Sequence, residues 1–582
     1  MKFFISIQFI FIFSFGFSQS DSVIVNTWNQ MAFLEDSMNH NLFIGGPSSV
    51  SFNLKFSKNK VNLFENGSFY QKEQIDMPFL KNNVPILDAQ YIIGDELEQN
   101  LALFHSQPIS NRSNYAVSFL KRSHDGYYLN QATNANFFQA NYFYRSEQNT
   151  YELKTSLKHH RIYNEQNGGV TNDSSFTDSN FDILNRKLID VNLDNAYTND
   201  KLWRLKIQQT LFKKDSLNKK AKLHSITSID RRVRNYFDSL NADLFLYNYM
   251  DTIRSNDSII THDINQSVKY YLLDESDSIS SKRVSFFYHG NLSFYHGNLS
   301  FFNNHTIDTL FQNHKVGFDI SVNNKQSYLS ASIDYTLFGF RNNNFNAVLN
   351  YNRFIKTNVK FSSEFFLKRL TPSYEIHQFT SNHVAWNNNP NDIYFGGLNS
   401  YFSFNKLKIK ANIFMIKNPV YFDNSFSPVS TLDTVQIIQS GLNYKMANKK
   451  LEVDCELLYQ YQGGLSIYQL PNWLGFARVY YKLTHEKSNS KLYLGLRGRF
   501  FSSFNLMDYS PQTNQFLVSN ERLQNPYGII DVLAKAKIKN VTIYAMLSHV
   551  NAGLLGYEYF TNLHYPQPDR YFKFGLKWLF LN

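Results

Sequence analysis

The sequence lacks the features that hold many exported or membrane-embedded chains together. It contains a single cysteine, Cys455, so no disulfide can form within the chain. Beyond residue 20 there is no run of about 18 apolar residues, the length that a membrane-spanning helix needs. The mean hydropathy is −0.39. These absences exclude a disulfide-stapled domain and a protein that crosses a membrane with helices.

Catalytic and cofactor motifs are absent as well. We find no Walker loop, no dinucleotide-binding glycine motif and no nucleophile elbow. The adjacent His159 and His160, and the repeated His289 and His296, have no carboxylate or thiol at a ligand spacing. No motif selects a triad from the many Ser, Asp and His residues. We therefore expect no enzyme activity, no cofactor and no metal site.

The N-terminus has the order of a secretory signal peptide. Lys2 precedes the apolar stretch "FFISIQFIFIFSF", and the small residues Gly16 and Ser18 follow two apart. We expect cleavage after Ser18, so that residues 1–18 are the signal peptide and Gln19 begins the mature chain. A membrane anchor is the alternative, but the apolar stretch is short for a span and the chain turns polar at "SDS".

Aromatic side chains are abundant: they make up 17% of the residues, with 54 Phe and 38 Tyr. A soluble protein would have to bury most of these rings in two or three cores, yet no Pro-, Gly- or Ser-rich linker separates such domains. A closed barrel in a membrane exposes its outward face to lipid and gathers aromatic residues at the interfaces. The net charge of +11 is spread over both signs along the chain, so we expect no nucleic-acid partner.

Apolar and polar residues alternate in the final segment, "RYFKFGLKWLFLN". One set contains Phe572, Phe574, Leu576, Trp578 and Phe580, and the other contains Tyr571, Lys573, Gly575 and Lys577. The same period recurs in "LKIKANIFM" (407–415), "LEVDCELLY" (451–459), "KLYLGLRGRF" (491–500) and "DVLAKAKI" (531–538). A repeated period of two predicts β-strands. A helix would also place Lys573 and Lys577 on one face, but Gly575 and the β-favouring aromatic residues disfavour it.

The charged sets predict which side of these strands meets lipid. Lys or Arg on the lipid side costs about 2–4 kcal/mol at the midplane. Turning Lys406, Lys408 and Lys410 outward would therefore cost up to about 6–12 kcal/mol, which is comparable with the whole stability of a protein. The apolar sets face lipid and the charged sets face the lumen. The predicted lumen-lining residues are Lys408, Lys410, Glu452, Asp454, Glu456, Arg497, Arg499, Lys535, Lys537, Lys573 and Lys577.

The expected fold is an all-β, transmembrane, antiparallel up-and-down β-barrel. Allowing about 35–45 residues for a hairpin with its loops, we expect about 12–16 strands. Short periplasmic turns at 341–344, 448–450 and 539–540 are expected to alternate with long outer loops such as 549–569.

The strand patterns begin near residue 48, so we assign residues 19–47 to a lead-in segment and residues 48–582 to the barrel. Residues 213–285 are rich in charge and Ser, and their broken alternation predicts long outer loops around two or three strands. The tandem repeat "FYHGNLSFYHGNLS" at 287–300 has an odd period of seven, which would reverse the faces of the second copy in a straight strand. We therefore expect a loop or bulge to absorb it.

A lumen lined by ionised side chains stays wet, because burying unpaired charge in a dry interior is costly. A wide barrel then leaves a pore, whereas cross-paired charges or a folded-in loop would close it. We expect a porin-like channel for passive diffusion of small hydrophilic solutes, whose lumen charges set its preference. The alternatives are a barrel transporter for hydrophobic solutes and a barrel that displays its loops in a structural or adhesive role. No plug domain precedes the strand patterns, which disfavours an energy-coupled receptor.

The last strand resembles the C-terminal signal of bacterial outer-membrane barrels, in which a polar residue is followed at fixed spacing by Gly and two aromatic residues. Lys573, Gly575, Trp578 and Phe580 occupy these positions, although two further residues follow the last aromatic. The resemblance implies two partners: the barrel-assembly machinery, which reads this signal, and outer-membrane lipid.

Longer stretches resemble the putative porin family of the Bacteroidetes. They are "YIIGDELEQNLALFHSQPISN" (91–111), "SHDGYYLNQATNANFFQANYFYRSEQNTY" (123–151), "NEQNGGVTND" (164–173) and "YPQPDRYFKFGLKWLF" (565–580). The resemblance runs over most of the mature chain and implies a channel in the outer membrane of a Gram-negative bacterium. It brings no catalytic residues, and neither the solute nor the oligomeric state follows from it.

Overall fold

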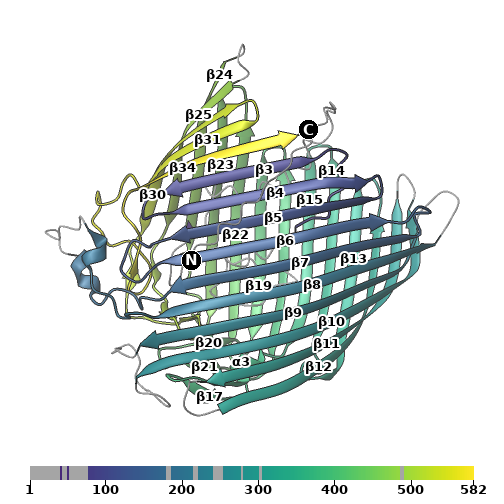
Figure 1. Ribbon diagram of the computed structural model, residues 1–582, viewed down its shortest axis with the longest axis horizontal. Coiled ribbons are helices and arrows are strands. Elements are labelled where there is room, and N and C mark those ends of the chain that lie inside the picture. Colours follow the sequence, from purple (N-terminus) through teal and green to yellow (C-terminus); the bar gives the residue numbers. More distant parts are fainter. Residues whose placement is uncertain are drawn as a thin grey trace, which may run out of the picture.

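Antiparallel strands form the wall of one closed barrel, in which the first and last strands pair with each other (Figure 1). The computed structural model describes residues 40–41, 49–50, 77–177, 185–213, 220–239, 253–276, 280–299, 305–485 and 490–581. The expected signal peptide and nearly all of the expected lead-in segment lie outside these residues. No helix among the described residues is long and apolar enough to cross a membrane.

The wall contains 22 strands that follow one another in chain order. They are β3 (Ile86–Gly94), β4 (Gln99–Ser110), β5 (Ser113–His124), β6 (Thr133–Arg145), β7 (Tyr151–Glu165), β8 (Tyr197–Lys213), β9 (Lys220–Ser239), β10 (Arg254–Ser276), β11 (Ser281–Leu299), β12 (His305–Asn323), β13 (Ser327–Gly339), β14 (Phe345–Lys356), β15 (Val359–Leu370), β18 (Ile393–Phe404), β19 (Leu407–Lys417), β22 (Thr434–Ala447), β23 (Leu451–Gly464), β24 (Trp473–His485), β25 (Ser490–Phe501), β30 (Tyr527–Ile538), β31 (Val541–Ser548) and β34 (Tyr571–Leu581). The predicted all-β antiparallel barrel is confirmed. The expected count of about 12–16 strands is wrong, because an allowance of about 35–45 residues covers two strands and so counts hairpins.

The two ends of the barrel differ in the length of their connections. At the end where β34 stops and β3 begins, two to six residues join successive strands. At the other end the connections have 4 to 31 residues, and these loops gather on the left of Figure 1. This asymmetry agrees with the expected short periplasmic turns and long outer loops. Residues 341–344 do form a short turn, but they join β13 to β14 at the loop end.

The long loops carry the remaining short elements. These are η2 (Asp173–Phe176), η3 (Arg186–Leu188), α3 (Tyr374–His377), β16 (Gln378–Thr380), β17 (Ala385–Asn387), β20 (Val420–Phe422), β21 (Pro428–Ser430), β26 (Phe504–Asn505), β27 (Asp508–Ser510), β28 (Gln515–Leu517), β29 (Leu523–Gln524), β32 (Phe560–Asn562) and β33 (Tyr565–Pro566). Ahead of the barrel, β1 (His40–Asn41) pairs with β2 (Ser49–Val50). The first strand of the wall is β3, and since residues 51–76 lie outside the described part, the expected barrel start near residue 48 stays a prediction.

Between residues 213 and 285, nearly all described residues lie in strands, so the expected two or three strands are present and are longer than the predicted long loops would allow. β9 and β10 have 20 and 23 residues, and β11 already begins at Ser281. By contrast, β31 has 8 residues, so the wall is taller on the β9–β10 side. A strand that crosses the bilayer needs only about 9–11 residues. The alternation is broken here because the ends of these strands extend beyond the bilayer, where both faces can be polar.

The apolar set of the last strand points outward, as predicted. Phe572 and Trp578 are 45% and 44% exposed, whereas Tyr571 on the opposite face is 5% exposed. Exposed apolar side chains recur around the wall, including Ile413 on β19 and Leu496 on β25. Only a hydrocarbon environment makes such a continuous apolar exterior favourable, so this surface is the lipid-facing belt.

Residues 287–299 of the tandem repeat lie within β11, and no bulge in that strand absorbs the repeat. The strand pairs with β12 in continuous register from Ser281 to Leu299. Tyr288 in the first copy is 40% exposed, whereas its counterpart Tyr295 in the second copy is 7% exposed. The predicted reversal of faces is confirmed, and the expectation of a loop or bulge is wrong. The strand tolerates the reversal because aromatic residues suit both the lipid side and the packed inner side.

Candidate functional site

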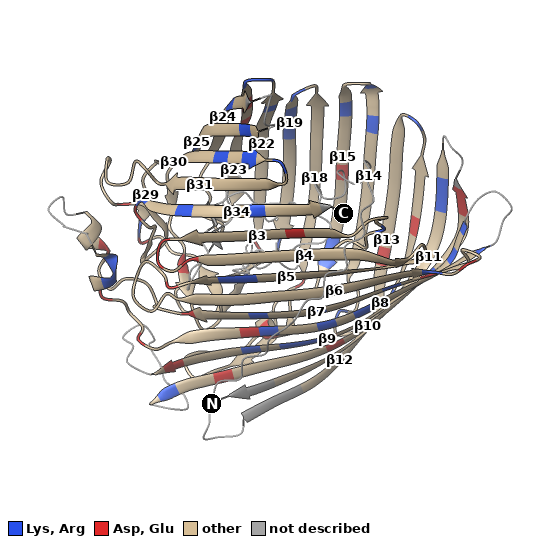
Figure 2. Ribbon diagram, turned by 45° about the horizontal axis from the view of Figure 1, so that its top comes forward, with Lys and Arg blue, Asp and Glu red and all other residues tan. Residues whose placement is uncertain are grey.

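The residues predicted to line the lumen all lie on the inner face of the wall, opposite the exposed apolar side chains. They come from β19 (Lys408, Lys410), β23 (Glu452, Asp454, Glu456), β25 (Arg497, Arg499), β30 (Lys535, Lys537) and β34 (Lys573, Lys577). Figure 2 shows charges of both signs along the strands. These residues are not equivalent, because their access to water differs along the barrel axis.

Near the short turns, inward-facing charges remain in contact with water. The Glu452 side chain keeps 39% exposure while one of its oxygens lies 3.1 Å from Lys482 Nζ. Lys408 and Lys537 are exposed, and Lys535 Nζ lies 5.3 Å from the centre of the Tyr493 ring. Charged groups that face inward and stay hydrated make this half of the lumen a wet vestibule.

Arg497 and Arg499 point inward as predicted, but they do not line water. They are 3% and 6% exposed, and their guanidinium nitrogens lie 2.7 and 3.4 Å from Asp531 Oδ2. Asp531 is fully buried, and its other oxygen accepts hydrogen bonds from the Ser548 hydroxyl and from the His549 N–H. The two arginines therefore neutralise a buried carboxylate on the inner face of the wall.

Lys573 and Lys577 join the last strand to the beginning of the barrel. Lys577 Nζ lies 3.0 Å from Asp88 Oδ2 on β3, and Lys573 Nζ lies 2.8 Å from Glu98 Oε1 in the β3–β4 connection. Burial on its own raises the pKa of Glu98, but the Lys573 charge, assisted by His124, holds that pKa below its ordinary value. These ion pairs reinforce the seam at which the barrel closes.

The chain before β3 also lies against the inner wall. The Met77 N–H donates to Gln139 Oε1 at 3.1 Å, and Asn141 Nδ2 donates to the Met77 carbonyl at 2.7 Å. Asn82 Nδ2 donates to the Ser106 carbonyl at 3.1 Å. The described part of the N-terminal segment thus enters the lumen side of β4–β6 before the first strand begins.

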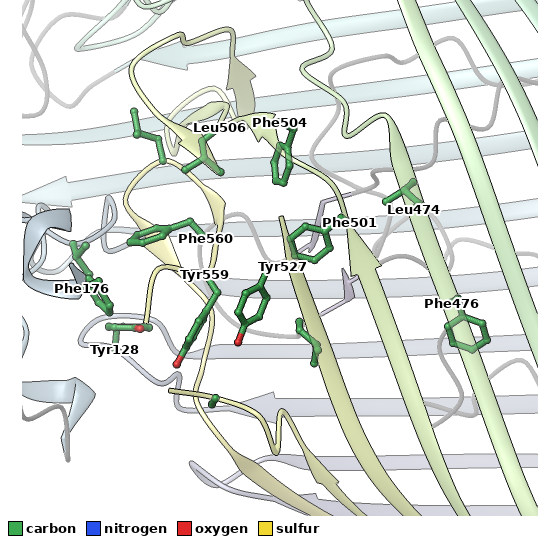
Figure 3. Close-up of a cluster of buried hydrophobic side chains, with 14 of the residues drawn as sticks. Tyr128, Phe176, Leu474, Phe476, Phe501, Phe504, Leu506, Tyr527, Tyr559 and Phe560 are labelled. Carbon is green, nitrogen blue, oxygen red and sulfur yellow. The ribbon is translucent and has the colours of Figure 1, made fainter. Parts of the chain in front are cut away.

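Four loops converge at the other end and form a cap. Tyr128 of the β5–β6 loop, Phe176 of η2, Phe504 of β26 and Phe560 of β32 share one buried cluster with Phe501 of the wall (Figure 3). The rings of Phe176 and Phe560 meet edge to face, with their centres 5.4 Å apart. Buried aromatic rings dominate packing energetics, so these loops are fixed to one another and to the wall.

Arg522 links three of the cap loops electrostatically. Its guanidinium nitrogens lie 3.0 Å from Asp173 Oδ2 in η2 and 3.1 Å from Glu558 Oε1 in the β31–β34 loop. Its central carbon also lies 4.1 Å from the centre of the Phe560 ring, within the range of a cation–π contact. The Arg522 guanidinium therefore joins three cap loops through two ion pairs and one cation–π contact.

The β25–β30 loop, residues 502–526, spans the mouth of the barrel, and we call it the strap. At its tip Gln512 Nε2 donates to Asp257 Oδ2 of β10 at 3.0 Å and to the Ser381 hydroxyl oxygen. Arg234 of β9 donates to the Gln512 carbonyl at 3.2 Å. In a ring of 22 strands, β10 lies eleven strands from β25, on the opposite side of the barrel. A folded-in loop, one of the two states left open by the sequence, is therefore present at the loop end.

The strap contains an acid, Asp508, whose pKa is raised. Burial raises the pKa of Asp508 in β27 to about 6; the Tyr509 N–H and His564 oppose this rise, and Glu521 and Asp173 add to it. Burial lowers the pKa of His564, but the hydrogen bond and charge of Asp173, together with the charges of Asp508 and Glu521, outweigh burial and leave the pKa raised. Asp508 therefore changes charge in mildly acidic solution.

The adjacent histidines of β7 contact aromatic rings. The His159 ring stacks on Trp203 with centres 4.0 Å apart, whereas His160 is 5% exposed and packs edge to face against Phe137. The two neighbours thus take opposite faces of β7. No group of three or more His, Cys, Asp or Glu residues in the described part of the chain is placed to hold a metal ion.

Sequence reasoning missed the basic partners of the predicted acids. Lys445 Nζ and an Arg478 nitrogen lie 2.9 and 3.6 Å from Asp454 Oδ2. Arg478 and Lys482 alternate with exposed Val479 on β24, so the same period of two would have placed them inward. Their pairing with particular acids depends on strand register, which has no local signal.

A closed barrel with an apolar exterior, short turns at one end and long loops at the other is an outer-membrane β-barrel protein. The location is accordingly the outer membrane. Residues 37–582 match the family described as "Putative porin", and the chain belongs to this family. No curated protein matches the chain.

Several solved structures share the fold. The FrpB iron transporter from Neisseria meningitidis aligns with a TM-score of 0.59 at 10% identity, covering 86% of this chain and 82% of that one. The siderophore receptor PirA from Acinetobacter baumannii aligns with a TM-score of 0.59 at 8% identity, over 86% and 81% of the two chains. The copper transporter OprC gives 0.62 at 10% identity, over 87% and 82%. At such low identity the likeness concerns the fold alone.

Proposed function

We propose that the protein is a channel through which small hydrophilic solutes diffuse passively across the outer membrane. The observation that carries this proposal is the hydrated, charged inner face near the short turns, where Glu452 and Lys537 remain accessible. Ionised groups that stay exposed on an inner wall, unlike the buried Arg497–Asp531 pair, have water beside them. Membership of the "Putative porin" family supports the same function.

The strap sets the width of the proposed path. It is anchored on opposite walls, through its strand connections at one side and through Gln512 at the other. A barrel of 22 strands is otherwise wider than the 16–18-stranded porins that leave an aqueous channel. Solutes therefore pass beside the strap, which limits their size, and enter the vestibule, where the wall charges set ion preference.

Single-channel recording in planar bilayers tests the proposal. A folded, heat-modifiable barrel is expected to give discrete ohmic steps, and a folded barrel that stays silent contradicts the proposal. Glu452→Gln removes a negative charge from the vestibule and is expected to shift the reversal potential toward anions. Glu147→Gln is the matched control, because Glu147 lies in a short turn with a 77% exposed side chain.

A second candidate, a selective transporter, rests on the architecture. The similar barrels include iron and copper transporters and a siderophore receptor, and 22-stranded transporters have a plugged lumen. A selective transporter would be silent in bilayers yet bind or take up one ligand. A barrel that only displays its loops would be silent and bind no solute.

Export and assembly belong to the same proposal. Residues 1–18 direct export and are removed, and Lys573, Gly575, Trp578 and Phe580 are read by the barrel-assembly machinery. Trp578 and Phe580 stack with their ring centres 4.3 Å apart on the outward side of the closing strand, where such a reader has access. Replacing both by Ala is expected to reduce the folded, heat-modifiable fraction recovered from membranes.

A further inference from the structure

A polar cavity of about 660 Å³ lies in the inner wall of β10–β15. Its volume is within the range of about 300–1,000 Å³ that small-molecule sites occupy. Such sites are usually apolar with a few polar groups, but this lining carries six amides beside charged side chains of both signs. The asparagines that line it are Asn265, Asn291, Asn313, Asn344, Asn346 and Asn350.

Three of these asparagines form a ladder across neighbouring strands. Asn291 Nδ2 donates to Asn265 Oδ1 at 2.8 Å, and Asn313 Nδ2 donates to Asn291 Oδ1 at 3.1 Å. The Arg341 N–H then donates to Asn313 Oδ1 at 2.8 Å. A side-chain amide has two N–H donors and two acceptor lone pairs, so the ladder orients each amide while using only part of its capacity.

Both acids of the cavity are paired with lysines, and Arg341, Lys368 and Arg369 also belong to the lining. Lys269 contacts Asp319, and Lys315 Nζ lies 3.3 Å from Asp334 Oδ1. These pairs offset their own charges across β10, β12 and β13, and Arg369 is paired with Asp392 outside the lining. The six amides, with the Ser and Thr hydroxyls of the lining, then form most of the uncharged hydrogen-bonding groups offered to a ligand. A lining of this kind suits a solute that is polar and uncharged.

The tandem repeat supplies part of this lining. His289 and Asn291 of the first copy face the cavity. The second copy has the opposite phase and turns Tyr295 inward instead, where it is 7% exposed. Among the described side chains of the repeat, those that face the cavity belong to its first copy.

We propose that this cavity binds a neutral oligosaccharide. This inference rests on the proposed function, since the lumen is the route by which a solute reaches the inner wall. Sugar hydroxyls donate and accept hydrogen bonds, as amides do. Neighbouring hydroxyls of one sugar can therefore hydrogen-bond with several of the oriented asparagine amides at once. An apolar solute would desolvate the same amides without replacing their hydrogen bonds. The cavity is thus expected to bind neutral sugars more tightly than apolar solutes during their passage through the lumen.

Isothermal titration calorimetry on the detergent-solubilised full-length mature protein tests the proposal, with maltotriose as the probe. Saturable binding is expected, and Asn291→Leu should weaken it about tenfold. Asn350→Leu, at the edge of the same cavity, is a second variant in case the first does not fold. Asn412→Leu is the matched control, because Asn412 donates to Gln439 at 3.2 Å in a separate part of the wall and should leave the affinity unchanged.

The outcomes separate this inference from the proposed function. Binding that is absent, or that Asn291→Leu and Asn412→Leu weaken equally, overturns the sugar site even if the protein conducts ions. Binding that depends on Asn291 and Asn350 in a protein that is silent in bilayers supports the site and contradicts the channel. Trigalacturonate and trialanine are the comparison probes: tighter binding of either overturns the assignment to a neutral sugar, in favour of an acidic sugar held by Arg341 and Lys368 or of a peptide.

Discussion

At the scale of single residues, inward-facing charged side chains differ in their exposure to water at different positions in the barrel. Glu452 and Arg497 both face inward on neighbouring parts of the wall, yet one keeps 39% side-chain exposure and the other 3%. The difference arises from the buried partner Asp531, which draws Arg497 into a dry ion pair. Alternation assigns a face to a residue, whereas its environment depends on what lies across the strand pairing.

The buried ion pair predicts a large effect on stability. Asp531→Ala leaves Arg497 and Arg499 buried without their acid, and we expect a loss of about 3–5 kcal/mol in the free energy of unfolding. Glu147→Ala breaks its pair with Arg112, whose side chains are 77% and 48% exposed, so the expected loss is below about 1 kcal/mol. Urea titration in detergent, followed by tryptophan fluorescence, measures both. Equal losses would show that burial does not set the strength of these pairs.

Asp508 predicts a pH dependence of the cap. Its folded pKa, about 6, lies above the ordinary value, so protonation favours the packed strap. This contribution is fully present below the ordinary pKa of an aspartate and is lost as the pH rises through about 6. Limited proteolysis of the strap is therefore expected to be faster at pH 7.5 than at pH 5. Asp508→Asn should flatten this difference, and an undiminished difference in that variant would assign it to another group.

At the scale of elements, the seam between β3 and β34 decides whether the barrel closes. A Cβ added to Gly575 would lie 3.0 Å from Ile92 Cγ1, a buried side chain of β3. The glycine of the expected assembly signal therefore also makes room for the first strand. The seam is further held by the Lys577–Asp88 pair.

Gly575→Val is expected to destabilise the closed barrel by about 1–3 kcal/mol through overpacking at the seam. Gly498→Val is the matched control, because a Cβ there meets no atom within 4 Å. The temperature at which the heat-modifiable band converts to the unfolded form reports the effect. A shift of the same size in both variants would contradict the packing role of Gly575.

The strap predicts a change in conductance. Replacing residues 508–517 by a short Gly-Ser linker removes the tip that reaches the opposite wall, so the single-channel conductance is expected to rise severalfold. Deleting residues 553–556 is the control, because Leu554 and Leu555 at that loop tip are 72% and 81% exposed and lie outside the strap. An unchanged conductance in the strap variant would mean that the strap does not narrow the path.

At the scale of the whole molecule, the sequence predicted the barrel better than its contents. Period-two alternation is local, so the faces of Phe572 and Lys573 could be assigned from a few residues. The contact between Gln512 and Asp257 joins positions 255 apart in the chain, and no local pattern encodes it. The height of β9 and β10 was missed because strands outside the bilayer lose the alternation that reveals them. The cap, the strap and the polar cavity of β10–β15 could therefore be found only from the folded structure.

The central claim is that small hydrophilic solutes cross the membrane through this lumen. Osmotic swelling of liposomes that contain the purified protein measures that passage most directly, with a series of uncharged sugars of increasing size. We expect swelling rates well above those of protein-free liposomes, falling steeply as the sugar becomes too large to pass the strap. Swelling no faster than in protein-free liposomes, for every sugar and with a folded barrel in the bilayer, would contradict the account.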